Sequence, residues 1–351
     1  MVESEGFKLE EHQTRTEDGF ILVLHRIVPL KPRETNGDDA APPVLVMHGL
    51  MQDSEALLAG GREHALGLWL ASRGYDVFLG NNRGNRYSHK HLSWSPHDEA
   101  YWNFSIDELA RYDVPALVGA VLGVTRAPRL AYVGFSQGSA QMFAALSADT
   151  ALQARVALFA ALSPAARAKG LSKSVLTTLV QTNLRFINVL FGRRRMLPMT
   201  VMWQNILSRT QFVRAIDCAM WYLFSWSNSQ VSHARKCQLY PHIYSFASVK
   251  CVVHWFQMIR SRRLAMFDDT QDPAYAPVSY DITLIRCPVA VMFGGRDLIV
   301  ECESLSAELP NCVLSHCEDK YEHLDTMWAD TAKDAIFPRL HALLRALPPQ
   351  S

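Results

Sequence analysis

The chain has 351 residues, of which 49% are hydrophobic and 20% are charged. Its 35 basic and 34 acidic side chains leave a formal net charge of +1, so the composition gives no reason to expect nucleic acid or another acidic polymer as a partner. This length and apolar content favour one large α/β domain, or a domain with a sizeable insertion, over a helix bundle or a small sandwich.

Short apolar runs alternate with helical patterns along much of the chain, which predicts a mainly parallel sheet with helices on both faces. We expect the acidic N-terminal segment to precede the first strand. The expected strands, in chain order, are residues 20–27, 44–47, 76–79, 130–133, 156–160, 289–293 and 312–316. The expected helices are residues 63–72, 106–122, 137–146 and 326–347.

The alternation of strand and helix patterns stops after Pro164. Residues 165–277 show amphipathic helical patterns with aromatic and basic side chains, and the strand pattern returns at residues 284–293. We therefore expect residues 1–164 and 278–351 to form one doubly wound core, with 165–277 inserted after the sixth strand as a helical cap or lid. A separate C-terminal domain is the weaker alternative.

The segment Gly134-Phe135-Ser136-Gln137-Gly138 lies between an apolar strand pattern and a helix pattern rich in small residues. Its two glycines suit a turn in which the backbone is crowded, and a serine at the apex of such a turn points its hydroxyl clear of the sheet. These residues also fit an ordinary Gly/Ser turn, but the flanking strand and helix favour a nucleophile. We predict that Ser136 is that nucleophile.

A serine nucleophile needs a base within hydrogen-bond reach, and the base needs an orienting group. Asp297 follows the expected strand 289–293, at the edge where open α/β sheets carry their functional groups. His323 lies 26 positions further on (323 − 297), after the next expected strand. The order of serine, acid and histidine predicts a triad of Ser136, Asp297 and His323.

Other residues could take these roles. An aspartate after two glycines can also be a turn residue or a helix cap, and a histidine before Leu-Asp can lie on the surface. His316 is a weaker candidate for the base because it lies within an expected strand, and Asp319 and Asp325 are the fallback acids. The joint order of the three residues at strand ends favours Asp297 and His323.

An oxyanion site needs two backbone N–H groups that point at the developing charge. One should come from Gln137, directly after the nucleophile. The other should come from the His48-Gly49 turn after the strand 44–47, and we assign it to Leu50, with Met51 as the alternative.

Several segments beyond the serine turn also match a family pattern. They are TEDGFIL (16–22), HRI (25–27), HGL (48–50), GYDVFLGNNRGN (74–85), WNFS (102–105), DE (107–108), GFSQGSAQ (134–141), YSFASVK (244–250) and HWFQ (254–257). With them, roughly residues 6–345 resemble the acid lipase branch of the α/β-hydrolases, which holds the gastric and lysosomal acid lipases. Within that branch the chain is most similar to the fungal steryl ester hydrolases.

The resemblance implies an α/β-hydrolase fold and a lipid ester as substrate. Carried over position by position, it places the nucleophile on Ser136, the acid on Asp297 and the base on His323, with oxyanion amides on Leu50 and Gln137. This chemistry needs no metal and no organic cofactor.

The N-terminal residues bear on where the chain is found. Fungal members of the group usually carry a hydrophobic N-terminal anchor, whereas this chain opens on an acidic segment without the apolar region of a signal peptide. No stretch of the sequence reaches the apolar length that spans a bilayer. We expect an intracellular protein at a lipid droplet or membrane surface, with the cytoplasm as the alternative.

The insertion offers two features for lipid binding. Residues 175–191 carry apolar side chains at helical spacing and are followed by Arg193-Arg194-Arg195, which fits a helix on an anionic lipid surface and equally a core-facing cap helix. The aromatic cluster of Trp221, Tyr222, Phe224 and Trp226 fits an acyl or sterol pocket, or packing within the cap.

Together these patterns predict a serine hydrolase that cleaves lipid esters at a lipid–water interface through an acyl-enzyme. Steryl esters are the first expected substrate and triacylglycerols the second; a non-catalytic lipid-binding protein of the same fold is the rival from another class. The seven cysteines have an odd count and no framework spacing, which favours mostly buried thiols in a reducing compartment. Cys312, His316 and Cys317 lie close enough in sequence to suggest a metal site, but we do not favour one.

Overall fold

A sheet of nine strands forms the centre of the computed structural model, which describes residues 2–30, 41–167, 192–196, 206–270 and 275–348. The strands are β1 (Phe7–Arg15), β2 (Phe20–Pro29), β3 (Val44–Met47), β4 (Val77–Gly80), β5 (Lys90–His91), β6 (Leu130–Phe135), β7 (Val156–Leu162), β8 (Val289–Gly294) and β9 (Cys312–Glu318). Their order is β1-β2-β4-β3-β6-β7-β8-β9, with β5 beside β2. The pairs that include β2 are antiparallel and the pairs from β4 to β9 are parallel.

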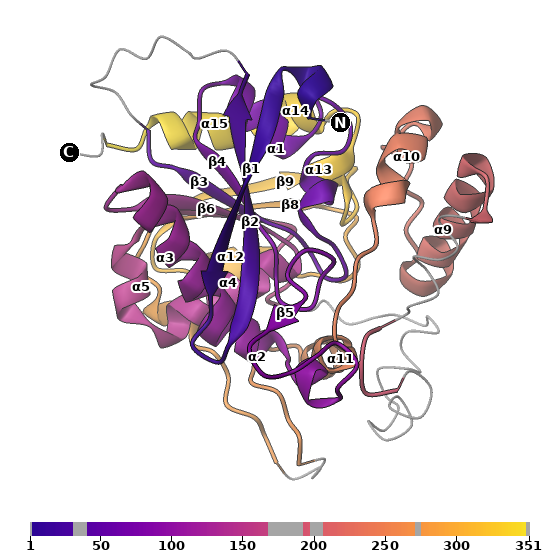
Figure 1. Ribbon diagram of the computed structural model, residues 1–351. Coiled ribbons are helices and arrows are strands. Elements are labelled where there is room, and N and C mark those ends of the chain that lie inside the picture. Colours follow the sequence, from indigo (N-terminus) through magenta and orange to yellow (C-terminus); the bar gives the residue numbers. More distant parts are fainter. Residues whose placement is uncertain (1, 31–40, 168–191, 197–205, 271–274, 349–351) are drawn as a thin grey trace.

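Helices cover both faces of this sheet. The helices of the described residues, on the sheet or beside it, are α1 (Leu66–Ser72), α2 (Ile106–Glu108), α3 (Val114–Thr125), α4 (Gln137–Ala148), α5 (Thr150–Ala154), α9 (Arg209–Phe224), α10 (His233–Leu239), α11 (Val249–Ser261), α12 (Glu303–Glu308), α13 (Asp325–Trp328), α14 (Ala332–Ala335) and α15 (Phe337–Arg345). In Figure 1, α1, α14 and α15 lie above the strands and α3, α4, α5 and α12 lie below them. On the face that carries α1 and α15, the ring of Trp69 in α1 packs against that of Phe337 in α15, with 5.4 Å between their centroids.

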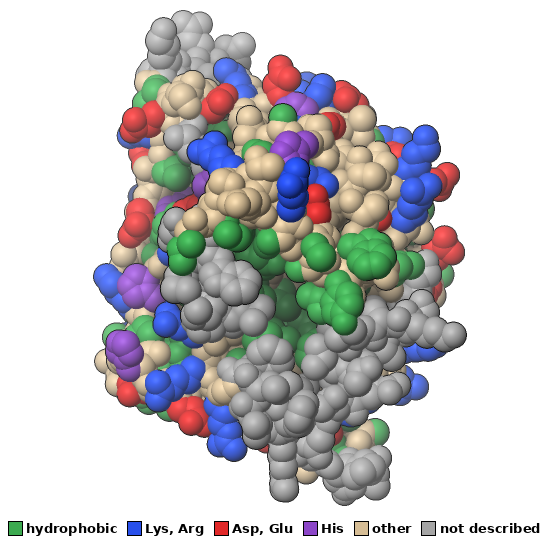
Figure 2. Space-filling view, turned by 90° about the vertical axis from the view of Figure 1, so that its right-hand side faces the viewer, with side chains coloured by type: hydrophobic (Ala, Val, Ile, Leu, Met, Phe, Trp, Pro, Cys, Tyr) green, Lys and Arg blue, Asp and Glu red, His purple; other side chains and the backbone are tan. Residues whose placement is uncertain are grey.

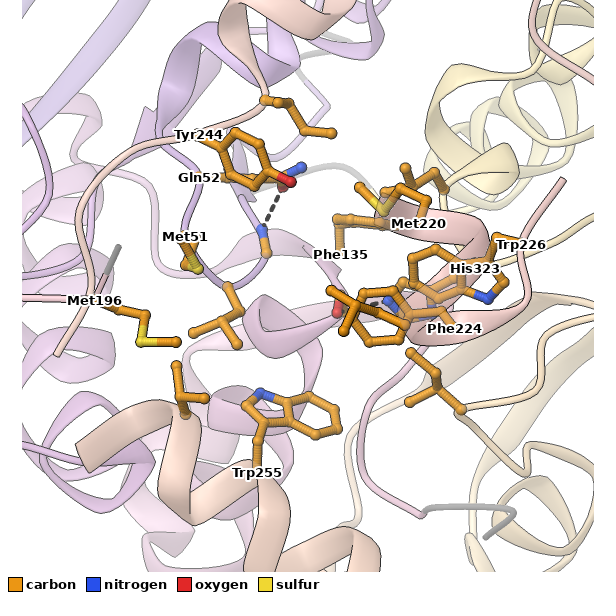
Figure 3. A pocket seen from close by; sticks show the side chains of 18 of the residues that line it. Met51, Gln52, Phe135, Met196, Met220, Phe224, Trp226, Tyr244, Trp255 and His323 are labelled. Atoms are coloured by element: carbon orange, nitrogen blue, oxygen red, sulfur yellow. Dashed lines mark hydrogen bonds between the residues drawn. The ribbon is translucent and has the colours of Figure 1, made fainter. Parts of the chain in front are cut away.

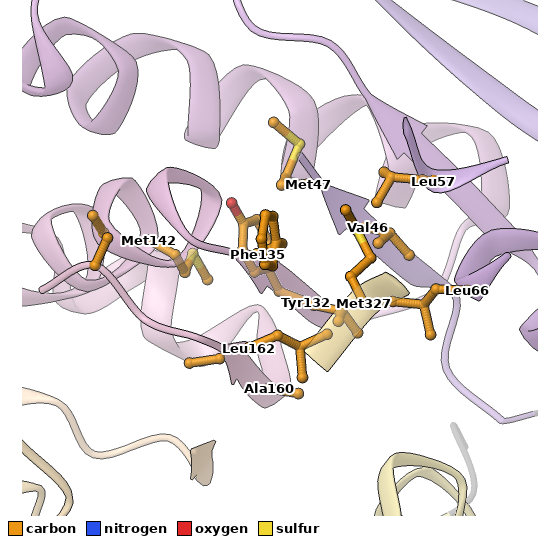
Figure 4. Packing of buried hydrophobic residues seen from close by; sticks show 14 of the residues in the cluster. Val46, Met47, Leu57, Leu66, Tyr132, Phe135, Met142, Ala160, Leu162 and Met327 are labelled. Carbon is orange, nitrogen blue, oxygen red and sulfur yellow. The ribbon is translucent and has the colours of Figure 1, made fainter. Parts of the chain in front are cut away.

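The middle strands are apolar because helices bury them from both sides. Every residue of β3, β4, β6, β7 and β8 is buried. Figure 4 shows side chains of these strands packed together, among them Val46, Tyr132 and Leu162. Such strands read as continuous hydrophobic runs, which is why the sequence pattern located them.

The structure confirms the predicted α/β fold class and contains each of the predicted strands, but the first and last elements differ from the prediction. In addition, β5 was not predicted, and the predicted helix 106–122 is interrupted by a π-helical turn at Leu109–Asp113. Residues 7–15 form β1 instead of a segment that precedes the sheet. Its side chains other than Phe7 are exposed or half-buried, so this polar strand at the end of the strand order lacks an apolar signal. The predicted helix 326–347 is split into α13, α14 and α15 because Ala329 leaves the helical conformation and Pro338 starts a new first turn.

The described part of the chain between β7 and β8 contains α9, α10 and α11 and no strand that joins the sheet. The strand β5 pairs only with β2 and is not part of the row from β1 to β9. When the strands of that row are counted in chain order, β7 is the sixth. Figure 1 shows α9 and α10 to the right of the strands. The apolar helix expected at residues 175–191 lies outside the described residues. None of the described helices is both long enough and apolar enough to cross a bilayer.

The turn between β6 and α4 brings three backbone segments into contact. Ser136, at its apex, has a φ of 51°, which few residues other than glycine adopt. A Cβ on Gly134 would lie 2.7 Å from the backbone of Gly138, and a Cβ on Gly138 would lie 2.8 Å from the carbonyl oxygens of Met47 and His48. Both glycines are therefore required by the close approach of α4 to β6 and to the end of β3.

We expect Gly138→Ala to lower the free energy of unfolding by about 1–3 kcal/mol, because the new methyl group has to displace the backbone at the end of β3. Gly123 provides the matched control, since it is exposed in α3 and a Cβ there would meet no atom within 4 Å. Gly123→Ala should raise the free energy of unfolding by about 0.5–1 kcal/mol. Urea unfolding measures both changes, and wild-type stability of Gly138→Ala would contradict the crowded turn.

Candidate active site

The structure brings Ser136, His323 and Asp297 together, although they lie in three separate parts of the chain. The Nε2 atom of His323 is 2.8 Å from Oγ of Ser136, and its Nδ1 atom is 2.7 Å from Oδ2 of Asp297. The carboxylate can only accept a hydrogen bond, so Nδ1 carries the proton and Nε2 is left to accept the serine O–H. This tautomer is the one that a general base requires.

Each of the three residues lies just beyond a strand. Ser136 follows β6, Asp297 follows β8 and His323 follows β9, so the parallel register of the sheet places all three at the same edge. The residues Ser136, Asp297 and His323 are buried, with 6%, 1% and 5% of their surface exposed. Asp297 is held by the N–H of Ile299, which donates to Oδ1 at 3.0 Å and leaves Oδ2 for the imidazole.

The alternative residues have other partners. His316 lies within β9 and its Nε2 atom contacts Glu318 at 2.7 Å, while Asp319 is exposed. Asp325 is buried, but its carboxylate accepts the N–H of Glu322 at 2.7 Å, and burial raises the pKa of Asp325 to about 6. These residues do not occupy the positions of base and acid beside Ser136.

The predicted oxyanion groups lie on two neighbouring turns. Gln137 is the first residue of α4, and Leu50 follows the end of β3, which pairs with β6 so that Met47 is opposite Gly134. Neither of the N–H groups of Leu50 and Gln137 has a hydrogen-bond acceptor among the described residues. Both are therefore available to an oxyanion beside Ser136.

The turn that contains Leu50 is held by hydrogen bonds on both sides of that residue. The N–H of Gly49 donates to Oε1 of Gln52 at 2.9 Å. Met51 has a left-handed backbone, with a φ of 58°, and its carbonyl accepts the N–H of Ser245 from the insertion. These bonds fix the direction of the Leu50 amide without using its N–H.

Beneath this turn lies a buried polar network centred on His48. Burial lowers the pKa of His48 to about 4, so its imidazole is neutral near neutral pH. Its Nε2 atom accepts the N–H of Asn82 and the side-chain amide of Asn85, both at 3.3 Å, and its Nδ1–H donates to the carbonyl of Gly49 at 2.8 Å. Sequence reasoning missed Asn82 and Asn85 as supports, although polar side chains directly after the buried strand β4 were the available signal.

Ser136 opens into an apolar cavity of about 420 Å³. Figure 3 shows Met220, Phe224, Trp226 and Trp255 around it, and Figure 2 shows a hollow lined by hydrophobic side chains on the same side as the insertion. Among the described residues that line it, the polar side chains besides Ser136 and His323 are those of Gln52 and Tyr244. This volume falls within the range of small-molecule sites, and the lining suits a substrate that is almost wholly hydrocarbon.

The aromatic cluster of the insertion is divided between two surfaces. Phe224 and Trp226 line the cavity. Trp221 and Tyr222 point to the solvent instead, with 64% and 57% of their surfaces exposed. The expectation of an aromatic pocket wall therefore applies to the first pair and not to the second.

The arrangement can carry out acyl transfer with protein groups alone. A hydroxyl bonded to an imidazole, an imidazole oriented by a carboxylate and two backbone amides are the groups from which acyl transfer takes its nucleophile, its base and its electrostatic stabilisation. Among the described residues, no group of three or more His, Cys, Asp or Glu side chains is placed to hold a metal ion.

Most of the chain matches known protein families and relatives. Residues 42–330 match the family described as "alpha/beta hydrolase fold", and residues 1–61 match the "Partial alpha/beta-hydrolase lipase region". A Schizosaccharomyces pombe protein named "Probable lipase" is 40% identical over 96% of this chain and 77% of its own length. Human "Gastric triacylglycerol lipase" is 30% identical over 96% of this chain and 88% of its own length.

Solved structures share the fold at low sequence identity. An α/β-hydrolase fold protein from Nakamurella multipartita is 16% identical, with a TM-score of 0.53 over 96% of this chain and 99% of that one. An esterase from a Rhodococcus species is 15% identical, with a TM-score of 0.53 over the same shares of the two chains.

We expect a fluorophosphonate probe to label the folded protein at Ser136, because the hydroxyl is bonded to a base and faces the cavity. Ser136→Ala should abolish labelling. Ser147→Ala is the control, since Ser147 lies on α4 and donates to the carbonyl of Phe143 at 2.7 Å, remote from the imidazole. Peptide mass spectrometry locates the adduct; a probe bound with equal yield to Ser136→Ala would contradict the assignment.

Proposed function

Because the chain belongs to the α/β-hydrolase family, in its acid lipase branch, we propose that it uses Ser136, His323 and Asp297 to hydrolyse esters of long-chain fatty acids, with steryl esters as its first substrates. It is a carboxylic ester hydrolase of the lipase type. The observation that carries the proposal is the hydrogen-bonded Ser136 hydroxyl at the wall of an apolar cavity.

In the proposed reaction, Oγ of Ser136 attacks the carbonyl carbon of the ester while its proton moves to Nε2 of His323. Asp297 accepts the Nδ1–H bond and stabilises the imidazolium that forms. The N–H groups of Leu50 and Gln137 stabilise the negative oxygen of the tetrahedral intermediate. When the C–O bond breaks, the proton on Nε2 passes to the leaving alcohol oxygen and the acyl group stays on Ser136.

Water then completes the reaction. It attacks the acyl carbon, gives a proton to Nε2 of His323 and forms a second tetrahedral intermediate in the same oxyanion site. Collapse of this intermediate releases the fatty acid, and the proton returns from Nε2 to Oγ of Ser136.

The choice of steryl esters rests on shape and resemblance. The cavity has broad aromatic walls, which include Phe224, Trp226 and Trp255. A rigid fused-ring alcohol loses less conformational entropy against such walls than a flexible one does. The segments that resemble fungal steryl ester hydrolases point to the same substrate. Triacylglycerol is the second candidate, because the human relative named for that substrate covers 96% of this chain.

We also propose that the insertion contacts the lipid surface through the exposed side of α9. Trp221 and Tyr222 lie on that side, while Met220, Leu223 and Phe224 of the same helix line the cavity. Trp and Tyr are the side chains that favour the boundary between water and lipid. A surface that holds this helix would present its esters next to the cavity.

We expect the purified protein to hydrolyse cholesteryl oleate and triolein as emulsions, with the steryl ester cleaved several-fold faster at equal lipid surface. Ser136→Ala controls for non-enzymatic release of fatty acid. Faster hydrolysis of triolein would favour the second candidate. A marked preference for p-nitrophenyl acetate over both emulsions would contradict a lipid ester as the substrate.

We expect the double substitution Trp221→Ser, Tyr222→Ser to reduce the rate on emulsions about tenfold, which corresponds to a loss of about 1.4 kcal/mol of binding to the lipid surface. Hydrolysis of a short soluble ester should change little, because neither side chain lines the cavity. Flotation with lipid emulsions measures binding directly. An equal loss of activity on both kinds of substrate would argue against surface docking.

A further inference from the structure

His323 lies between two aromatic rings that come from different parts of the chain. The indole of Trp226 is nearly parallel to the imidazole, with 5.2 Å between the ring centroids and 7° between the planes. Figure 3 shows the two side chains next to each other. The ring of Phe135 is tilted by 51° at 5.4 Å. Phe135 belongs to β6, whereas Trp226 comes from the turn after α9. The insertion thus contributes a face-to-face contact with the imidazole.

The turn that carries Trp226 is bonded to the residue directly before His323. The carboxylate of Glu322 accepts the N–H of Ser227 at 2.9 Å, the hydroxyl of Ser227 at 2.9 Å and the N–H of Asn228 at 2.7 Å. Glu322 is only 8% exposed, so these charge-assisted bonds form away from water. One carboxylate therefore fixes the indole and the imidazole relative to each other.

We propose that Trp226 is a positioning residue for His323 and that Glu322 holds it in place; this rests on the triad chemistry proposed above. His323 carries a positive charge from the moment Ser136 gives up its proton until the alcohol leaves. A cation over the face of an indole is attracted by the ring electrons. The same contact keeps the imidazole from turning away from Ser136. The insertion then acts on the chemical step as well as on the shape of the cavity.

None of the other described charged groups near the imidazole is hydrogen-bonded to the indole ring itself. Asp297 accepts its Nδ1–H, Glu322 is bonded to the Trp226 turn, and Asp325 accepts the N–H of Glu322. The positive charge of Lys236 in α10 favours the ionised form of Asp325. A substitution of Trp226 leaves all four groups in place, so its effect on the pH profile reports the loss of the indole.

The decisive variants are Trp226→Leu, which removes the aromatic face, and Trp226→Phe, which keeps one. On a short soluble ester, Trp226→Leu should lower kcat about three- to thirtyfold, the range that corresponds to a cation–aromatic contact, with a smaller change in KM. Trp226→Phe should stay within about threefold of the wild type. The acid limb of kcat/KM against pH should move to lower pH in Trp226→Leu, because the imidazolium of the free enzyme is less stable.

Trp94→Leu is the matched control. Trp94 also stacks on a histidine: its ring centroid lies 4.3 Å from that of His91, and the two ring planes differ by 10°. Neither residue of this pair lines the cavity. The control should keep the kcat and the pH profile of the wild type. Circular dichroism and melting temperatures establish that the variants compared are folded.

A double-substitution cycle tests the role of Glu322. Glu322→Gln provides a single acceptor oxygen for three donors, so it should release the turn and lower kcat in the same direction as Trp226→Leu. In the Trp226→Leu background the same change should cost little, because Glu322 acts through the indole. If Trp226→Leu fails to fold, the kcat and pH profile of Glu322→Gln, compared with those of the wild type, still test the contact.

The proposal is overturned if Trp226→Leu, folded and labelled at Ser136, keeps the wild-type kcat and acid limb. It is also overturned if Trp226→Phe loses as much activity as Trp226→Leu, or if the effects of Glu322→Gln and Trp226→Leu are additive. These outcomes are distinct from failure of the proposed function, in which the wild-type protein itself hydrolyses no ester.

Discussion

The contact between the backbone at the start of α4 and the end of β3 determines the geometry of the whole site. Gly138 lies against the carbonyl oxygens of Met47 and His48 with no room for a side chain between them. Since Met47 pairs with Gly134, the residues after β3 run level with those after β6. The turns that carry Ser136 and Leu50 therefore lie side by side at one edge of the sheet, and the register of β7, β8 and β9 brings Asp297 and His323 to the same edge.

Polar and apolar contributions to the site come from opposite sides. The sheet side supplies buried hydrogen-bond networks, such as that of His48, Asn82 and Asn85, which fix backbone turns. The insertion supplies most of the hydrophobic lining that the structure describes, and α9 and α11 are its main contributors. Glu322 and the Ser245–Met51 bond are points where the two sides are tied by hydrogen bonds. Backbone turns fixed by hydrogen bonds thus lie next to a cavity whose shape depends on the packing of hydrophobic side chains.

The elements that could be predicted from the sequence are those with a local pattern of apolar residues. Buried parallel strands read as apolar runs, and Ser136, Asp297 and His323 each follow such a run. Their order and their places after strands, together with the family resemblance, predicted that they would meet. The strand β1 was missed because its polar residues carry no such signal. The supports of the site were also missed, because the contacts of Asn85 with His48 and of Glu322 with Asn228 join segments 37 and 94 positions apart. Nor could periodicity separate Trp226 from Trp221, since a left-handed Ser225 turns the chain between them.

The polar character of β1 has a consequence for the behaviour of the protein in solution. A strand at the end of a sheet presents backbone groups to which a strand of another molecule can add, the first step of edge-to-edge aggregation. Along β1 the side chains of Lys8, Glu10, Glu11 and Arg15 are exposed or half-buried, and Lys8 and Glu10 form an ion pair at 3.1 Å. An incoming strand would have to strip water from these charges, so the same composition that hid β1 in the sequence protects the sheet from growing between molecules.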